Sequence, residues 1–85
     1  MNLPQDIEAQ IVDYLHLEFG EDADDPNSLK ESELRYEGEF LFDGVPTHYW
    51  RFPCTIEQCW ATVEPMEESY CIGMTTESPQ GLKHA

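Results

Sequence analysis

The first hydrophobic pattern along the chain has the period of a helix. Its apolar stripe repeats at every fourth position: Leu3, Ile7, Ile11, Leu15 and Phe19. The acidic residues of this stretch fall largely off the stripe. We expect a helix over 3–19, with Asn2 as its N-cap, Pro4 in its first turn and Gly20 just past its end.

The pattern then changes twice. Residues 21–33 are polar and turn-rich, and Ser28 followed by Glu31 fits a capping box for one short helical turn. From residue 34 the hydrophobic period is two, which predicts β-strands separated by turns. Asp43-Gly44 is a hairpin signal that ends the first strand at Phe42. We expect three further strands, at 47–52, 57–64 and 69–76.

The register of the first hairpin decides which aromatic residues share a face. A two-residue turn would pair Phe42 with Val45 and put Trp50 and Phe52 on the face opposite Phe40. Burying these aromatics together is worth several kcal/mol on an area basis, more than the turn preference. We therefore predict an odd-length loop or a bulge at 44–46.

In the last hairpin we expect Val63 to pair with Tyr70, which sets Cys59 and Cys71 on opposite faces of the sheet. The predicted fold class is α+β, an N-terminal helix packed on a four-stranded antiparallel meander sheet. Residues 1–76 would form a single domain and 77–85 a flexible C-terminal tail. The helix covers one sheet face, so a functional surface is expected on the other.

Charge narrows the class of partner. The chain has 18 acidic against 4 basic residues and a formal net charge of −14. Direct binding of nucleic acid and of anionic membranes is disfavoured, and a basic protein partner is favoured. The alternative is that the charge only maintains solubility.

The N-terminus shows no secretory signal, and three cysteines do not describe a disulfide framework. We expect a cytoplasmic protein without a cofactor. The core of an 85-residue chain leaves little room to enclose a deep substrate cleft, which favours a non-enzymatic role.

Metal and thiol sites are weakly indicated. Cys54 and Cys59 are spaced within the tolerance of a zinc ligand pair, but His48 and Cys71 add no second pair. The polar segment 21–33, called the acidic loop below, also has the spacing of a calcium loop. However, Pro26 and Asn27 stand at the two strictest positions of such a loop. No metal ligand and no catalytic residue is predicted, and a thiol or zinc protein using Cys54 and Cys59 is kept as an alternative function.

Recognition is the leading hypothesis. Aromatic residues ringed by carboxylates suit an Arg- or Lys-rich partner through cation–π contacts and ion pairs, although the same aromatics could simply form the core. A second hypothesis is a nucleic-acid mimic that uses the acidic loop, which could equally be only a solvated segment. The predicted partner-binding residues are Asp22, Asp24, Asp25, Glu37, Glu39, Tyr49, Trp50 and Trp60.

Overall fold

The computed structural model describes residues 3–54 and 58–85, so the expected N-cap Asn2 and the expected first residue of the strand at 57–64 lie outside the described residues. Helix α1, Ile7–Phe19, begins later than the apolar stripe predicts, because Pro4 lies in a turn before it and accepts a hydrogen bond from Ile7 N at 3.2 Å. Gly20 ends the helix in the left-handed conformation, with φ 66°, as predicted. No described helix is long and apolar enough to cross a membrane.

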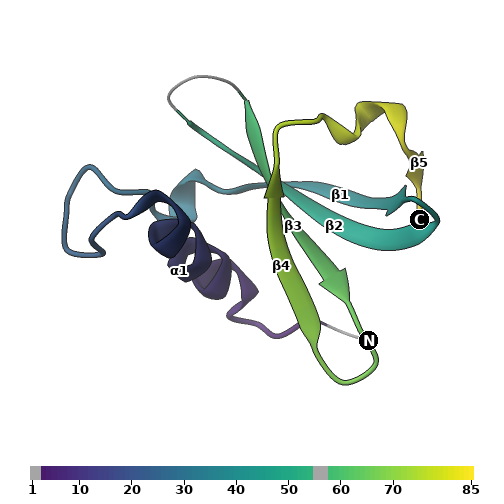
Figure 1. Ribbon diagram of the computed structural model, residues 1–85, viewed down its shortest axis with the longest axis horizontal. Coiled ribbons are helices and arrows are strands. Elements are labelled where there is room, and N and C mark those ends of the chain that lie inside the picture. The colour runs from purple at the N-terminus through teal and green to yellow at the C-terminus, as the bar shows by residue number, and fades with distance from the viewer. Residues whose placement is uncertain (1–2, 55–57) are drawn as a thin grey trace.

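The buried face of α1 follows the predicted stripe. Ile7, Ile11 and Leu15 are buried against Trp50 and other residues of the sheet, and Val12 joins them. Phe19, the last residue of the stripe, is 46% exposed. The helix therefore covers one face of the sheet (Figure 1).

The short helical turn in the polar segment lies later than predicted. The 3₁₀ helix η1, Glu31–Glu33, follows Lys30, whose backbone N–H donates to the Glu33 carboxylate at 3.0 Å. Ser28 is therefore not the capping residue. Its hydroxyl donates instead to the carbonyl of Asp25 at 2.8 Å, within the preceding turn.

The sheet has five strands rather than the predicted four. Their order is β4-β3-β2-β1-β5, all pairs antiparallel. The bounds are β1 Arg35–Phe42, β2 Val45–Phe52, β3 Cys59–Pro65, β4 Tyr70–Thr75 and β5 Lys83–His84.

The additional strand β5 comes from the segment expected to be a tail. A 3₁₀ helix, η2 Pro79–Gly81, precedes it, and β5 pairs with β1. The ring of His84 lies 4.6 Å from that of Phe40, and Ala85 N donates to Glu39 O at 3.0 Å. The predicted flexibility of 77–85 stays a prediction, while the four-strand count was wrong.

The first hairpin keeps its tight turn, so the bulge predicted at 44–46 was wrong. Phe42 pairs directly with Val45 across Asp43 (φ 52°) and Gly44 (φ 81°), as a primed two-residue turn requires. The register instead shifts between Tyr36 and Gly38, where Gly38 has φ 126°. The irregularity lies in β1, at the far end of the hairpin.

This register gives the protein two small cores instead of one. Trp50 and Phe52 lie with the helix in the first cluster, whereas Phe40 packs with Tyr49 and Trp60 in a second cluster on the opposite face. The prediction that Trp50, Phe52 and Phe40 share a face was therefore wrong. Leu82 packs against the second cluster, so the C-terminal segment buries Phe40 without any change to the turn.

The last hairpin is shifted by two residues from the prediction. Val63 pairs with Ile72 and Pro65 with Tyr70. A shift of two keeps every side chain on its face, so Cys59 and Cys71 still lie on opposite faces, as expected.

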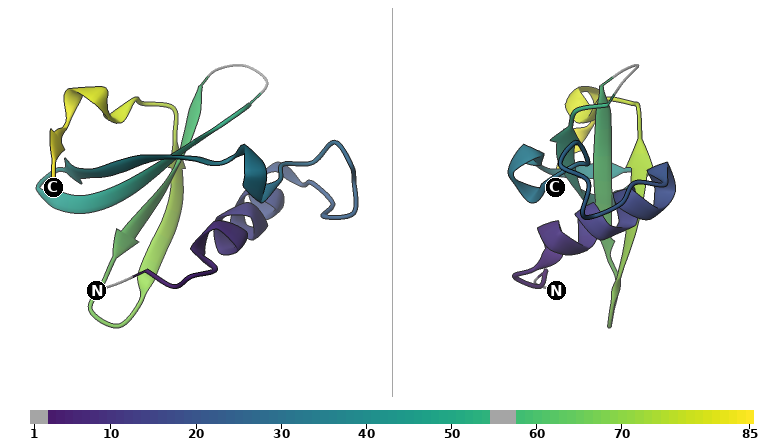
Figure 2. Two further views of the ribbon diagram at one scale, coloured as in Figure 1. Left: turned by 180° about the vertical axis from the view of Figure 1, so that it is seen from behind. Right: turned by 90° about the vertical axis from the view of Figure 1, so that its left-hand side faces the viewer.

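The hairpins β1–β2 and β3–β4 are joined by a short β2–β3 ladder and diverge beyond it, which forms a fork in the sheet. The ladder between β2 and β3 runs only from Phe52↔Cys59 to His48↔Val63, and beyond it the hairpins β1–β2 and β3–β4 point in different directions (Figures 1 and 2). The segment after β4 returns across the opening toward β5. This fork determines where the sheet face is hollowed.

Candidate functional site

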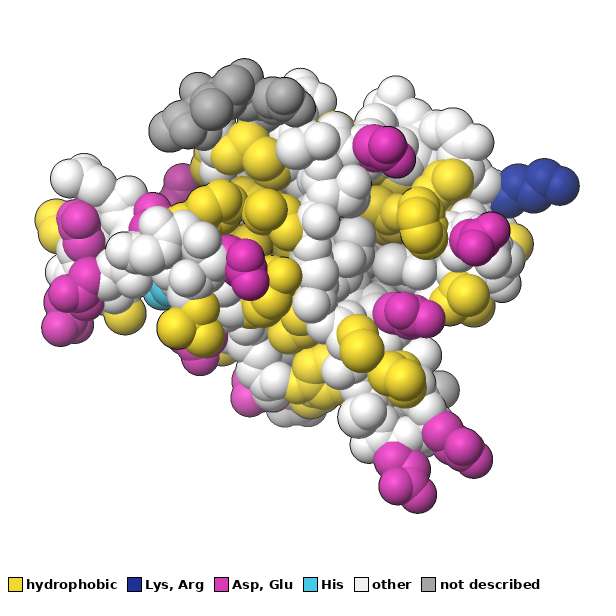
Figure 3. All heavy atoms as spheres, viewed as in Figure 1, with side chains coloured by type: hydrophobic (Ala, Val, Ile, Leu, Met, Phe, Trp, Pro, Cys, Tyr) yellow, Lys and Arg dark blue, Asp and Glu magenta, His cyan; other side chains and the backbone are white. Residues whose placement is uncertain are grey.

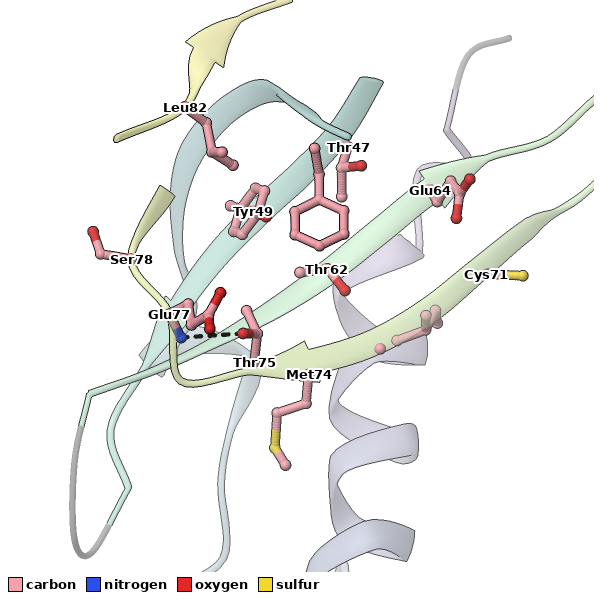
Figure 4. A pocket seen from close by; sticks show the side chains of 13 residues that line it. Thr47, Tyr49, Thr62, Glu64, Cys71, Met74, Thr75, Glu77, Ser78 and Leu82 are labelled. Carbon is pink, nitrogen blue, oxygen red and sulfur yellow. Dashed lines mark hydrogen bonds between the residues drawn. The ribbon is translucent and has the colours of Figure 1, made fainter. Parts of the chain in front are cut away.

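A groove of about 480 Å³ occupies the fork, on the sheet face opposite α1 (Figure 4). Its walls come from the tip of the β1–β2 hairpin, the middle of β3 and β4, and the segment 77–82. The groove exists because the strands separate where the β2–β3 ladder ends. The groove therefore lies on the face that the helix does not cover, and a function for this face stays a prediction.

The floor of the groove is rich in hydroxyl groups. Thr47 and Tyr49 come from β2, Thr62 from β3 and Thr75 from β4. Gly73 contributes no side chain, and a Cβ atom there would lie only 3.0 Å from Thr62 Oγ1. A ligand group above Gly73 thus meets several oxygen atoms that can accept hydrogen bonds.

Two carboxylates mark the ends of the groove. Glu64 lies at one end and Glu77 at the other (Figure 4), and both side chains are exposed. The described residues that line the groove include neither Lys nor Arg. Within the described chain the ion pair found is His48–Glu39, so the charges of Glu64 and Glu77 are not neutralised there.

Tyr49 joins the groove to the second core. Its ring packs edge-on against Phe40, with 5.6 Å between centroids. Burial raises the pKa of the Tyr49 hydroxyl, and the nearby Glu77 carboxylate raises it further. The hydroxyl therefore stays protonated at neutral pH.

Apolar side chains complete the surface of the groove. Phe42 is 53% exposed, and Leu82 is partly buried against the second core. Figure 3 shows hydrophobic side chains gathered between β4 and the C-terminal segment, with acidic side chains around them. The combination of apolar surface and unpaired carboxylates suits the stem and the charged head of a Lys or Arg side chain.

The predicted aromatic residues are mostly interior. Tyr49 is 3% exposed, and both Trp50 and Trp60 are 4% exposed. Trp50 lies under the helix, where its Nε1 donates to Glu8 Oε2 at 3.0 Å. Trp60 lies on the groove side, and its Nε1 donates to Glu37 Oε1 at 3.4 Å. Of the predicted aromatics, only Tyr49 lines the groove.

The predicted carboxylates do not form one surface. Glu37 accepts from Trp60, and Glu39 Oε2 lies 3.5 Å from His48 Nε2. The polar segment between α1 and β1 lies at the end of the molecule away from β5 (Figure 1) and carries the predicted loop residues, all exposed: Asp22, Asp24 and Asp25. The groove and the acidic loop are therefore separate surfaces.

The acidic loop is held by hydrogen bonds between residues two positions apart in the sequence. Asp22 Oδ1 accepts from Asp24 N at 3.0 Å, and Asp25 Oδ1 accepts from Asn27 N at 2.9 Å. His16, on which the sequence pattern placed no role, fastens the loop to the helix through Nε2, 2.8 Å from the carbonyl of Leu29. Because a carbonyl can only accept, Nε2 carries the proton.

A polar cluster on the helix face links two strands. The Tyr36 hydroxyl lies 2.8 Å from His48 Nδ1, and Glu39 lies beside the other ring nitrogen. Burial raises the pKa of Tyr36, and the charge of Glu39 adds to the effect, which disfavours a phenolate nucleophile. The cluster is built from cross-strand neighbours, which no spacing along the sequence could have predicted.

The cysteines correct a prediction. Cys54 and Cys59 are joined by a disulfide between the end of β2 and the start of β3, although no disulfide framework was expected. Cys71 is free and exposed. The described residues contain no group of three or more His, Cys, Asp and Glu side chains that could hold a metal ion. The disulfide thus engages both sulfurs of the alternative thiol or zinc site.

The two arginines lie together, away from the groove. Arg35 and Arg51 are directly opposite each other at the bulged end of the β1–β2 hairpin. Both line a separate hollow of about 630 Å³ beside η1. Positive charge is thereby concentrated at this end of the hairpin.

The comparisons with known proteins give no assignment. Neither a protein-family model, nor a curated protein, nor a solved structure matches this chain.

The groove brings in residues that the sequence did not single out as binding residues. Glu77 and Leu82 were assigned to the tail, and Phe42 to the strand pattern alone. Thr62 and Glu64 alternate with buried Ala61 and Val63 along β3. That period of two is the sequence signal that could have placed their side chains on the face opposite the helix.

Proposed function

We propose that this protein is a non-enzymatic, acidic protein-binding module, an adaptor, inhibitor or accessory subunit that docks a basic partner. The partner binds at the groove on the sheet face opposite α1. The observation that carries the proposal is the pair of exposed carboxylates, Glu64 and Glu77, at the ends of a groove whose described lining lacks Lys and Arg.

The mechanism combines steering and anchoring. A net charge of −14 attracts a cationic surface from a distance, and salt screens this attraction. At contact, a Lys or Arg side chain lies along Phe42 and Leu82. Its head group is then within the groove formed by Tyr49 and the two glutamates. The exposed carboxylates contribute more to the rate and selectivity of association than to its final free energy.

The test is a charge reversal in the groove against an equal reversal elsewhere. The double variant Glu64→Lys/Glu77→Lys is compared with Asp13→Lys/Glu31→Lys, which changes the net charge equally at exposed positions of α1 and η1. The probe is a short peptide of alternating Lys and Thr, titrated by NMR at about 20 mM and about 200 mM salt. We expect the groove variant to bind about tenfold more weakly than the control variant.

Two outcomes would contradict the proposal. If both variants lose the same affinity, the peptide responds to net charge alone and the groove is not the site. If the Lys–Thr peptide shifts no resonance of the wild-type protein, a basic partner is excluded for this surface.

The acidic loop supports a second candidate, a nucleic-acid mimic that blocks a DNA- or RNA-binding protein. The supporting observation is that hydrogen bonds between residues two apart in the sequence hold the backbone around exposed Asp22, Asp24 and Asp25. Such a mimic would bind a cationic nucleic-acid-binding protein with strong salt dependence. Reversing the three aspartates to Lys should abolish that binding, whereas the groove variant should retain it; the opposite result assigns binding to the groove.

A further inference from the structure

Strand β4 is the long free edge of the sheet. In the strand order β4-β3-β2-β1-β5, the described chain pairs β4 only with β3. The free edge faces the viewer in Figures 1 and 3, and Figure 3 shows a band of white backbone and polar atoms along the line of β4. Helix α1 and the C-terminal segment lie to either side of this band.

The register identifies the backbone groups that point outward. At the turn of the β3–β4 hairpin, Met66 N donates to Ser69 O at 2.8 Å, so this is a hydrogen-bonded pair. Hydrogen-bonded and non-bonded pairs alternate along an antiparallel ladder. The N–H and C=O groups that point away from β3 therefore belong to Tyr70, Ile72 and Met74.

The edge lacks the features that usually prevent strand pairing. The sequence of β4, Tyr-Cys-Ile-Gly-Met-Thr, holds no charged residue and no proline. By contrast, β5 at the opposite edge is only two residues long and includes Lys83. An uncharged edge six residues long is a template for an added strand.

The charges around the edge select its occupant. Glu67 and Glu68 form the turn before β4, and Glu77 follows it closely. A second copy paired antiparallel along β4 would bring the two glutamates of one turn toward Glu77 of the other copy. A parallel copy would juxtapose identical acidic turns. Self-pairing is therefore opposed, and an added strand that carries positive charge is favoured.

Gly73 connects the edge to the groove. The side chains of Cys71 and Thr75 lie on the groove side of β4, at the same alternation as Gly73, whereas Met74 points away from the groove (Figure 4). Because Gly73 has no side chain, a long residue on a strand paired with β4 can cross above it. Beyond Gly73, the end of that side chain would reach the hydroxyl-rich floor of the groove between Glu64 and Glu77.

We propose that an extended basic segment of a partner protein binds as a sixth strand along the free edge of β4, with a Lys or Arg side chain crossing Gly73 into the groove. This inference rests on the proposed function and specifies its binding mode. Main-chain hydrogen bonds from Tyr70, Ile72 and Met74 provide the affinity, and the groove selects positive side chains.

The test removes one outward donor and little else. In Met74→Pro the strand loses an N–H that has no partner in β3, a position at which an edge strand tolerates proline. Met74→Ala is the matched control, because it removes the side chain and keeps the N–H. With the Lys–Thr peptide as probe, we expect an affinity loss of about tenfold or more in Met74→Pro and less than about twofold in Met74→Ala.

Hydrogen exchange gives a second readout that does not need a variant. Saturating peptide should slow the exchange of the amides of Tyr70, Ile72 and Met74 by about tenfold or more, because these donors become bonded. If Met74→Pro does not fold, the peptide is instead N-methylated at alternate residues. Methyl groups on the N–H groups of the peptide edge that pairs with β4 should then abolish binding to the wild-type protein.

The outcomes separate this inference from the proposed function. If Met74→Pro binds like wild type, or the three amides gain no protection, strand addition is wrong even where the Glu64→Lys/Glu77→Lys variant still binds weakly. If the peptide does not bind the wild-type protein at all, the proposed function fails as well. A dimer in sedimentation equilibrium that Met74→Pro abolishes would overturn the choice of a basic segment in favour of a second copy.

Discussion

A hydrogen bond between Trp50 and Glu8 ties a sheet tryptophan to the helix across the main core. Trp50 is only 4% exposed and the hydrogen bond is partly buried, so this acceptor matters more than a fully exposed carboxylate would. A buried donor without an acceptor costs about 1–3 kcal/mol.

Glu8→Ala should therefore lower the free energy of unfolding by about 1–3 kcal/mol. Glu8→Gln should lower it less, because the amide oxygen still accepts from Trp50 Nε1. Urea unfolding followed by tryptophan fluorescence measures both. Equal losses in the two variants would show that the indole does not depend on this acceptor.

The raised pKa of Tyr49 predicts how the free energy of unfolding changes at alkaline pH. Burial raises the pKa of Tyr49 in the folded protein above its ordinary value, and the charge of Glu77 raises it further. As pH rises through about 10, the unfolded chain releases the tyrosine proton before the folded chain does. The stabilising contribution of the neutral hydroxyl is therefore complete below pH 10 and is lost above it.

In urea unfolding, wild type should lose stability more steeply than Tyr49→Phe as the pH rises above about 10. The difference isolates Tyr49 from the other groups that titrate in this range. Phenolate absorbance of the folded proteins provides the check. A wild-type-minus-variant titration with its midpoint at or below 10.0 would contradict the pKa shift.

Among the elements, β1 depends on one glycine. Gly38 has φ 126°, a conformation that L side chains rarely adopt, and it allows the register shift beside Tyr36. Without this shift, the faces of Tyr36 and the residues before it would be exchanged.

Gly38→Ala should destabilise the protein by about 1–3 kcal/mol because the backbone is strained, even though the new methyl group finds ordinary contact space. Gly81→Ala is the matched control, since Gly81 has no positive φ and no atom within 4 Å of its would-be Cβ. Thermal or urea unfolding of the pair decides the matter. Similar stabilities for both variants would mean that β1 accommodates the shift without a glycine.

At the scale of the whole molecule, self-repulsion is the dominant electrostatic feature. With 18 acidic and 4 basic residues, few carboxylates can have a cationic neighbour. Both arginines lie at one end of the β1–β2 hairpin. The compact state holds these negative charges closer together than the unfolded chain does, and salt screens their repulsion.

Added NaCl should therefore stabilise the fold. We expect the urea midpoint to rise between about 20 mM and about 500 mM NaCl, with an unchanged slope of free energy against urea. Urea is suitable because it is uncharged and does not itself screen. A midpoint that stays constant or falls would show that the negative charges are far enough apart to be harmless.

The sequence alone determined the features that depend on neighbouring residues. Ile7, Ile11 and Leu15 predicted the buried helix face, Gly20 its end, and Asp43-Gly44 the position of the first hairpin, although not its two-residue turn. The composition determined the charge. These predictions succeed because helix periodicity, glycine at φ above zero and turn preferences act within a few residues.

The tertiary structure alone decided which face each aromatic residue occupies and where the groove lies. The tight register of the first hairpin, with Phe42 opposite Val45, separates Phe40 from Trp50, and Leu82 makes that separation possible by covering the second face. The one-residue shift at Gly38 then places Tyr36 opposite Trp50. The fork, strand β5 and the position of Glu77 likewise depend on contacts between residues distant in the chain. Local patterns cannot predict them, because strand register depends on the packing of both faces at once.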